Sequence, residues 1–163
     1  MVVFYLGYCY SRHFEIYQIA NQAKGAIVNV CAASRAYLPT TARRKLFVHL
    51  NLMHASAYCA LTPIYTYDNF LSIFSKLHHI EIPDHHAYFG DVDTAGGTHY
   101  NTCAVWAMGV LQKAATDGEL HPEAFRSMHE EILRARSLFS TIFAFQYQVS
   151  TRKYQEVTGS DRK

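Results

Sequence analysis

A run of twenty residues without a formal charge places the strongest constraint on the fold. Residues 46–65, LFVHLNLMHASAYCALTPIY, contain no Asp, Glu, Lys or Arg. A helix of this length is long enough to cross a bilayer, and it is equally suited to the interior of a helical bundle. His49, Asn51, His54 and Ser56 interrupt the run, and each of these side chains is costly against lipid. We therefore expect a helix that is buried among other helices and does not cross a membrane.

Prolines and glycines divide the rest of the chain into helical segments. Before Pro39 there is no proline, and apolar side chains recur every three or four residues, which is the period of a helix with one buried face. Pro63 stops a second segment, the Asp117-Gly118 pair stops another, and Pro122 opens the last one. The pattern predicts an all-α bundle of long helices, near residues 2–38, 41–61, 66–77, 99–116 and 122–147. On the apolar stripes of these helices we expect five side chains to be largely buried: Met53, Tyr58, Trp106, Ile132 and Phe139.

The histidines are the main candidates for metal ligands. Residues 78–98 lack a sustained period and contain Pro83 and several glycines, so we expect a long loop there. Four histidines of this loop flank Asp84: His78, His79, His85 and His86. Imidazole and carboxylate suit zinc or iron, although a solvated polar loop explains the same residues. The solvated loop is the favoured interpretation, so we predict no metal site and no cofactor.

Other chemical signatures are weak. His49 and His54 are five residues apart, whereas helical metal pairs are separated by three or four. Nucleophile and metalloprotease motifs such as GxSxG and HExxH are missing from the sequence. The four cysteines are widely spaced in apolar segments, which predicts free thiols in a reducing compartment. The net charge of +2 is too small for a general polyanion-binding field, so nucleic acid is not an expected partner.

The order of several motifs resembles the bestrophin family of anion channels. Residues 4–18, FYLGYCYSRHFEIYQ, are similar to the end of that family's second transmembrane helix and its cytosolic extension. That segment of the family has an aromatic-rich run, then Ser-Arg, two bulky residues, and a Tyr followed by Glu or Gln. The corresponding residues here are Ser11, Arg12, Tyr17 and Gln18.

The remaining motifs follow in the same order. Residues 42–70, ARRKLFVHLNLMHASAYCALTPIYTYDNF, are similar to the family's helix with a basic start and the turn and helix after it. Residues 105–136 resemble its Trp-containing helix, its acidic-Gly turn and its proline-started helix with a Glu-Glu…Arg run. Residues 140–148, STIFAFQYQ, resemble the Tyr-rich segment before the next span. The resemblance thus describes residues 1–148 as a partial bestrophin-like helical domain and leaves residues 149–163 as a disordered or divergent tail.

The resemblance implies an integral membrane channel for chloride or other small anions, and no enzyme. It implies a homopentamer around one axis, with the end of a transmembrane helix at the N-terminus and the bulk of this chain cytosolic. Phe4 would be the last hydrophobic ring of the pore neck, and Tyr8 would lie one turn below it. An anion that loses water in such a neck meets aromatic edges, which carry partial positive charge. Glu123 falls at or next to the cytosolic constriction.

The chain also departs from the family. Glu123 stands where animal members are apolar, and a ring of carboxylates there would repel anions. No membrane span follows Gln148, so we expect a fragment. The acidic calcium-binding clasp of animal members has no counterpart, so calcium regulation is not carried over. Two alternatives stay open: a soluble all-helical interaction domain, and a metal-dependent enzyme that uses the histidine loop.

Overall fold

Four helices build the part of the protein that the structure describes. The computed structural model describes residues 2–59, 76 and 99–159. Its elements are α1 (Val2–Tyr37), α2 (Thr40–Cys59), α5 (His99–Thr116) and α6 (Pro122–Gly159), and none of the described residues lies in a β-strand. The described chain is therefore all-α, as the sequence predicted.

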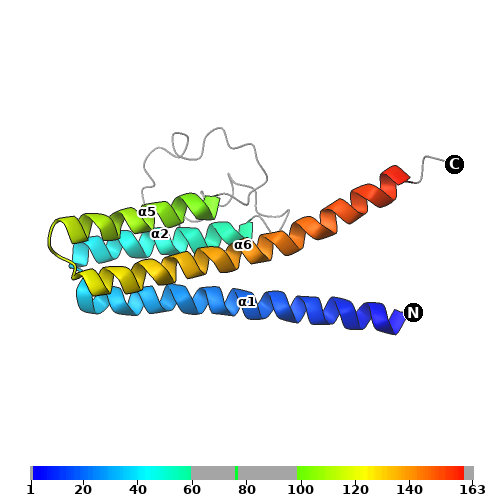
Figure 1. Cartoon of the computed structure of the whole chain (residues 1–163), viewed down its shortest axis with the longest axis horizontal. Helices are drawn as coiled ribbons and strands as arrows, with labels where there is room; N and C mark the ends of the chain where they lie inside the picture. The colour runs from blue at the N-terminus through cyan, green and yellow to red at the C-terminus, as the bar shows by residue number, and fades with distance from the viewer. Residues whose placement is uncertain (1, 60–75, 77–98, 160–163) are drawn as a thin grey trace.

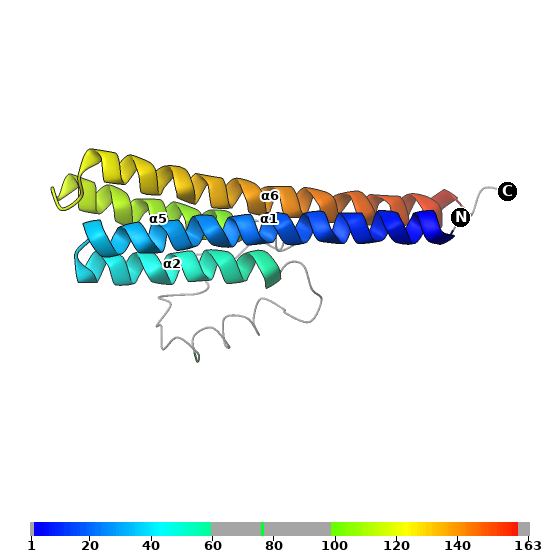
Figure 2. The ribbon, with the colours of Figure 1, turned by 90° about the horizontal axis from the view of Figure 1, so that it is seen from below.

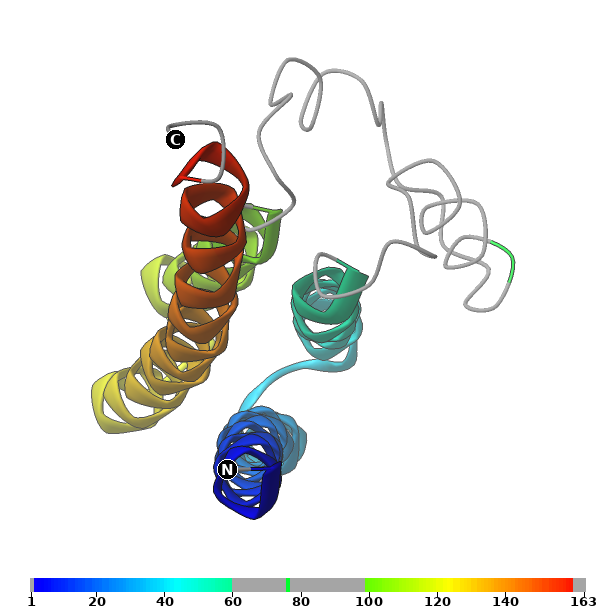
Figure 3. The same ribbon diagram turned by 90° about the vertical axis from the view of Figure 1, so that its right-hand side faces the viewer.

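The helices run alternately up and down in a bundle (Figures 1 and 3). α1 and α2 form one helical hairpin, α5 and α6 form a second, and both tight turns lie at the same end of the bundle. α1 packs mainly on α6 and α2 packs mainly on α5. At the other end, α1 and α6 extend well beyond the ends of α2 and α5 (Figure 2).

The turn between α5 and α6 is set by a glycine in the left-handed region. Gly118 has a φ of 75°, which costs little without a Cβ. The N–H of Glu119 donates to the carbonyl of Ala114 at 2.9 Å, and the N–H of Gly118 donates to the carbonyl of Ala115 at 3.2 Å. This pair of bonds is the Schellman motif, which satisfies the last carbonyls of a helix. The Asp117-Gly118 stop read from the sequence is therefore confirmed.

Proline marks the turn between α1 and α2. The N–H of Leu38 donates to the carbonyl of Ser34 at 3.1 Å and so completes the last turn of α1. Pro39 has no N–H to continue that helix, but its carbonyl accepts from the N–H of Arg43 at 2.9 Å and so starts α2. Leu38 is buried and holds this turn against the bundle.

Side chains spaced three and four residues apart form the core. On α6 the buried positions are Met128, Ile132, Ala135, Phe139, Ile142 and Phe143. On α5 they are Tyr100, Cys103, Ala104, Ala107, Leu111 and Ala114. This spacing is the one that lets the ridges of neighbouring helices interdigitate at a small crossing angle. The core continues through α2 at Leu46, Leu50, Leu52, Met53 and Ala57, and it reaches α1 at Ala23, Ala26, Ile27 and Val30.

Most predicted helix limits agree with the structure within two residues, and one does not. The helix expected over 99–116 is α5 with the same bounds, and the helices expected over 2–38 and 41–61 are α1 and α2. The last helix was expected to end near residue 147, but α6 continues to Gly159 through residues assigned to a disordered or divergent tail. Residues 148–158 contain neither Pro nor Gly, so nothing in that stretch stops the helix. The helix expected over 66–77 and the loop over 78–98 lie outside the described residues, apart from the helical Lys76.

Three of the five predicted core side chains are confirmed. Met53, Ile132 and Phe139 are each at most 1% exposed. Trp106 is partly buried and packs against the core, so it lies in the contact between helices but is more exposed than these three side chains. The side chain of Tyr58 is outside the described part of the structure.

Candidate functional site

The N-terminal part of α1 exposes aromatic and aliphatic side chains around its whole circumference. We call residues 3–17 the aromatic segment. Val3, Phe4, Tyr5 and Leu6 make one full helical turn and are 79%, 86%, 68% and 60% exposed. Further along the same segment, four more large side chains are at least half exposed: Tyr8, Tyr10, Phe14 and Tyr17. A helix that is apolar all round is typical of an environment that covers it on every side.

This exposure follows from the unequal lengths of the helices. α1 has 36 residues, whereas α2 has 20 and α5 has 18. At 1.5 Å per residue these lengths are about 54, 30 and 27 Å, so α1 extends beyond both of its shorter neighbours. The N-terminal half of α1 consequently lacks the cover that buries Ala23, Ala26 and Val30. α6 is long enough to follow α1, but the two helices diverge at this end (Figure 1).

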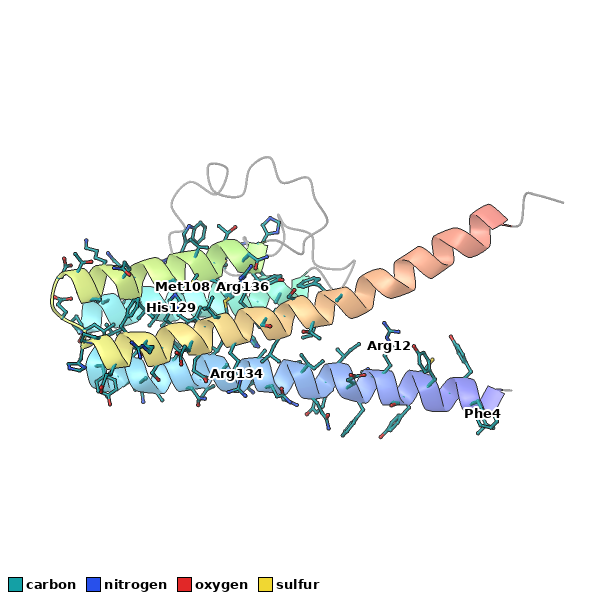
Figure 4. All side chains as sticks on the ribbon, viewed as in Figure 1. Phe4, Arg12, Met108, His129, Arg134 and Arg136 are labelled. Atoms are coloured by element: carbon teal, nitrogen blue, oxygen red, sulfur yellow. The ribbon has the colours of Figure 1, made fainter. Side chains whose placement is uncertain are left out.

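Phe4 and Tyr8, two of the predicted site residues, both lie in the aromatic segment. Phe4 is at the free end of α1 and its ring points away from α6 (Figure 4). Tyr8 is 57% exposed, and its hydroxyl accepts a hydrogen bond from Nη1 of Arg12 at 3.1 Å. Arg12 was not predicted as a site residue. The i,i+4 spacing of Tyr8 and Arg12 on a helix is the sequence signal that identifies this pair.

Glu123, the third predicted site residue, lies in the first turn of α6. Its N–H faces Nδ1 of His121 at 3.4 Å, and the carbonyl of His121 accepts from the N–H of Phe125 at 2.9 Å. His121 is therefore the N-cap of α6. The exposed Glu123 carboxylate stands at the positive end of the helix dipole, where a negative charge is favourable.

The structure does not bring Glu123 together with the aromatic segment. Nδ2 of Asn29 on α1 donates to Oε2 of Glu131 on α6 at 3.1 Å, which sets the two antiparallel helices in register. Glu123 lies two turns from Glu131 toward the hairpin turns, whereas Phe4 lies seven turns from Asn29 in the opposite direction. The two residues are therefore separated by roughly 50 Å along the helix pair at 1.5 Å per residue. If Phe4 and Glu123 contribute to the same function, they do so at two widely separated positions along the helix pair.

Two partly buried histidines of α2 lie beside aromatic rings of α5 and α6. The ring of His49 is 5.7 Å from that of Trp106 on α5, and the ring of His54 is 6.1 Å from that of Phe139 on α6. Burial lowers the pKa of both histidines, and Lys45 and Lys24 lower the pKa of His49 and His54 respectively. Five residues correspond to about 140° around a helix, so the two rings face different neighbours and do not form a metal pair.

The other buried groups are neutral and satisfied locally. Ser34 and Ser56 donate to the carbonyls of Cys31 at 2.8 Å and Met53 at 3.1 Å, within their own helices. Burial raises the pKa of the Cys103 thiol to about 12, and a hydrogen bond with Ser56 only partly opposes this shift. A thiol in this state is a packing group and not a nucleophile.

No set of three or more His, Cys, Asp or Glu side chains with the geometry of a metal site occurs among residues 2–59, 76 and 99–159. The histidine loop considered as a ligand set, His78, His79, His85 and His86, lies outside this part of the chain. Within the same ranges, no helix combines the length and apolarity needed to cross a bilayer.

Comparison with protein-family models, with curated proteins and with solved structures finds no match to this chain.

Proposed function

We propose that this chain is part of a bestrophin-like anion channel, a homopentamer in a membrane that conducts chloride or other small anions. The aromatic segment of α1 would line the neck of the pore, and the four-helix bundle would form the cytosolic vestibule. The full-circumference exposure of Val3 to Leu6 is the observation that most supports this proposal. Water is a poor solvent for such a turn, and equivalent turns packed around an axis would remove it from water.

The aromatic segment has the chemistry that an anion neck requires. A narrow apolar ring at Phe4 would close the pore by expelling water from it. Tyr8 and the Arg12 guanidinium lie one and two turns further along α1, and the hydrogen bond between them would hold the cation beside the pathway. A cation at the end of a dehydrated neck would raise the local concentration of anions.

Glu123 would form a second constriction on the cytosolic side. The start of α6 is exposed, and the Glu123 side chain is free of the core, so copies around an axis would present a ring of carboxylates. This ring would oppose anion entry and limit the current, because like charges repel the permeant ion. The roughly 50 Å between Phe4 and Glu123 agrees with two constrictions at opposite ends of one pathway.

The test is electrophysiology in cells that express the complete gene product containing this chain. Phe4→Ala is expected to widen the neck and leave a larger current under closing conditions. Glu123→Gln is expected to increase anion flux, because it removes the charge and keeps the size of the side chain. Val28→Ala, which changes an exposed residue of α1 at the level of the bundle, is the matched control and is expected to leave currents unchanged.

Each competing outcome has a defined meaning. Wild-type currents indistinguishable from those of untransfected cells would contradict the channel and favour a helical interaction domain. Currents that persist unchanged in Phe4→Ala but disappear in a double His85→Ala and His86→Ala variant would favour the histidine loop as the functional site. An unchanged current in Glu123→Gln would remove the start of α6 from the pathway.

A further inference from the structure

The four helices form a closed square, so the bundle has four outer edges. α1 packs on α2 and α6, and α5 packs on the same two helices, whereas the diagonal pairs make only minor contact. The α1–α2 edge and the α5–α6 edge therefore lie on opposite sides of the bundle (Figure 3). In the proposed channel residues of α1 and α6 line the pathway, so these two edges are the ones that would face neighbouring copies.

The α1–α2 edge exposes a phenylalanine. Phe47 of α2 is 52% exposed. The ring of His49 marks the side of α2 that faces α5, because it lies 5.7 Å from the ring of Trp106. Phe47 is two residues before His49, which corresponds to about 200° around the helix. Phe47 therefore points away from α5 and lies on the outer surface of the α1–α2 edge.

Basic residues flank Phe47 on the same edge. Residues 16–59 contain five Lys or Arg residues and no Asp or Glu. Arg43 and Arg44 are six and five residues before His49, so each lies at least about 120° from the side that faces α5. Arg43 donates a hydrogen bond to Oγ1 of Thr40 at 3.5 Å, and within the described chain no carboxylate forms an ion pair with either arginine. We call the surface of Arg43, Arg44 and Phe47 the basic edge.

The α5–α6 edge also exposes an apolar side chain. Oδ1 of Asn101 accepts from Nε of Arg136 at 2.6 Å, which marks the side of α5 that faces α6. Val105 lies four residues after Asn101, about 40° around the helix from it, and is 60% exposed. Met108 lies on the same side and is partly buried where α5 meets α6 (Figure 4). Val105 is thus an exposed apolar residue on the outer surface of this edge.

Carboxylates lie at the end of this edge, in the turn between α5 and α6. Asp117 and Glu119 are exposed, and residues 114–125 contain three carboxylates and no Lys or Arg. Within the described residues, neither Asp117 nor Glu119 is held in an ion pair. Arg126, in the second turn of α6, offsets part of this charge. We call the surface of Val105, Asp117 and Glu119 the acidic edge.

The apolar residues of the two edges lie at similar heights along the bundle. His49 and Trp106 are side by side and so mark one level on α2 and α5. Phe47 is two residues nearer to the hairpin turns than this level, and Val105 is one residue farther from them. At 1.5 Å per residue the two residues differ in height by about 4–5 Å. Rotation about an axis parallel to the helices keeps these heights, so Phe47 of one copy can contact Val105 of the next.

The charged residues match in the same way. Arg43 is six residues nearer to the hairpin turns than His49, and Asp117 is eleven residues nearer to them than Trp106. The difference in height is about 8 Å, which a long arginine side chain spans. The basic edge of one copy and the acidic edge of another can therefore make apolar and charged contacts together.

We propose that the basic edge of one copy docks against the acidic edge of a second copy. The contact joins two different surfaces, so its repetition around an axis closes a ring. Two basic edges repel each other, and this repulsion disfavours a two-fold dimer through the same surface. Exposed ion pairs add little affinity, so the charges determine which edges meet and the apolar contacts contribute more of the affinity. The inference rests on the proposed function for the pathway at the centre of the ring, but the pairing of edges does not require ion conduction.

Cysteine cross-linking tests which edges meet. The complete gene product carrying Phe47→Cys and Val105→Cys is treated in mild detergent with a short bifunctional maleimide, in a Cys9→Ser background because Cys9 is exposed. Both substituted positions are at least half exposed, so little core packing is lost. The double variant is expected to give a ladder of linked copies, with at least about tenfold more product than either single variant, because docking raises the effective concentration of the two thiols. Mass spectrometry identifies the linked residues.

Charge reversal tests the specificity of the contact. Adding Arg43→Glu and Arg44→Glu to the cross-linking variant is expected to reduce the ladder by at least about threefold, because like charges then face each other. Adding Asp117→Lys and Glu119→Lys as well is expected to restore the ladder. Lys113→Glu is the matched control, because Lys113 is exposed at the same end of the bundle but belongs to neither edge, and it is expected to leave the ladder unchanged.

The results distinguish this inference from the channel itself. Absence of the ladder in the double variant, links between two basic edges, or links from Phe47→Cys to a different protein would each overturn the proposal. A ladder that survives reversal of both arginines would overturn it as well. Currents without the expected links would contradict the pairing of edges and leave the channel standing. Links without currents would support the pairing of edges and contradict the channel.

Discussion

Phe139 provides the strongest test of how the bundle is held together. It has the largest side chain among those less than 2% exposed, and it lies where α6 meets α2 and α5. Its ring is 5.8 Å from that of Tyr100 in an edge arrangement and 6.1 Å from that of His54. Replacing Phe139 with alanine is expected to reduce the free energy of unfolding by about 3–5 kcal/mol, as buried aromatic truncations do. Each lost aromatic pair accounts for about 0.5–1.5 kcal/mol of that reduction.

This loss is large in relation to the stability of a domain, which is typically about 5–15 kcal/mol. With roughly 2–4 °C per kcal/mol for a chain of this size, Phe139→Ala is expected to unfold about 6–20 °C below the wild type. Circular dichroism of the helical signal during heating, together with urea unfolding, measures both quantities. Leu133→Ala is the control, because Leu133 is on the same helix and is 37% exposed.

The measured loss of stability distinguishes a buried Phe139 from one that packs loosely at the surface. A loss below about 1 kcal/mol in Phe139→Ala, or one equal to that of Leu133→Ala, would refute the packing described for α6, since surface substitutions stay within about 0.5 kcal/mol. If Phe139→Ala does not fold, Phe139→Leu retains an apolar side chain and is expected to be folded but less stable than the wild type.

Two further predictions concern the α5–α6 turn and the interior thiol. Gly118→Ala is expected to lower the free energy of unfolding by about 1 kcal/mol in urea titrations, because alanine is disfavoured at positive φ. The new Cβ would meet no atom within 4 Å, so an effect several times larger would contradict a purely backbone cause. Cys103 is expected to resist alkylation at neutral pH until the bundle unfolds, since a thiol of pKa about 12 is almost entirely protonated there. Peptide mapping should instead find the exposed Cys9 modified first, and rapid labelling of Cys103 in the folded chain would contradict its burial.

Local signals made most helix boundaries predictable. Pro39, Gly118 and Pro122 act through their own backbone restrictions, and the structure uses each of them at the expected place. The C-terminal end of α6 was not predictable in the same way, because residues 148–158 are mostly polar and give no apolar period, yet they contain nothing that breaks a helix. The place of Trp106 on the apolar stripe was predictable, but its partial exposure was not, because which side chains occupy the centre of a helix contact depends on how the two helices pack.

The sequence allowed the candidate site residues to be named, but it did not predict how they are arranged in space. Phe4 and Tyr8 were identified through a family resemblance, and their exposure depends on α1 being longer than α2 and α5, a relation between helices distant in sequence. His49 and His54 were considered only as a badly spaced metal pair. Their role in the interior depends on Trp106, Phe139 and Lys24, which belong to three other helices.

The candidate pore residues all belong to one half of the bundle. The aromatic segment and Glu123 belong to α1 and α6, the long pair, whereas α2 and α5 form the short pair. If Phe4 and Glu123 line one pathway, their separation along antiparallel helices requires the long pair to lie nearly parallel to it. The short pair then packs behind the pair that lines the pathway.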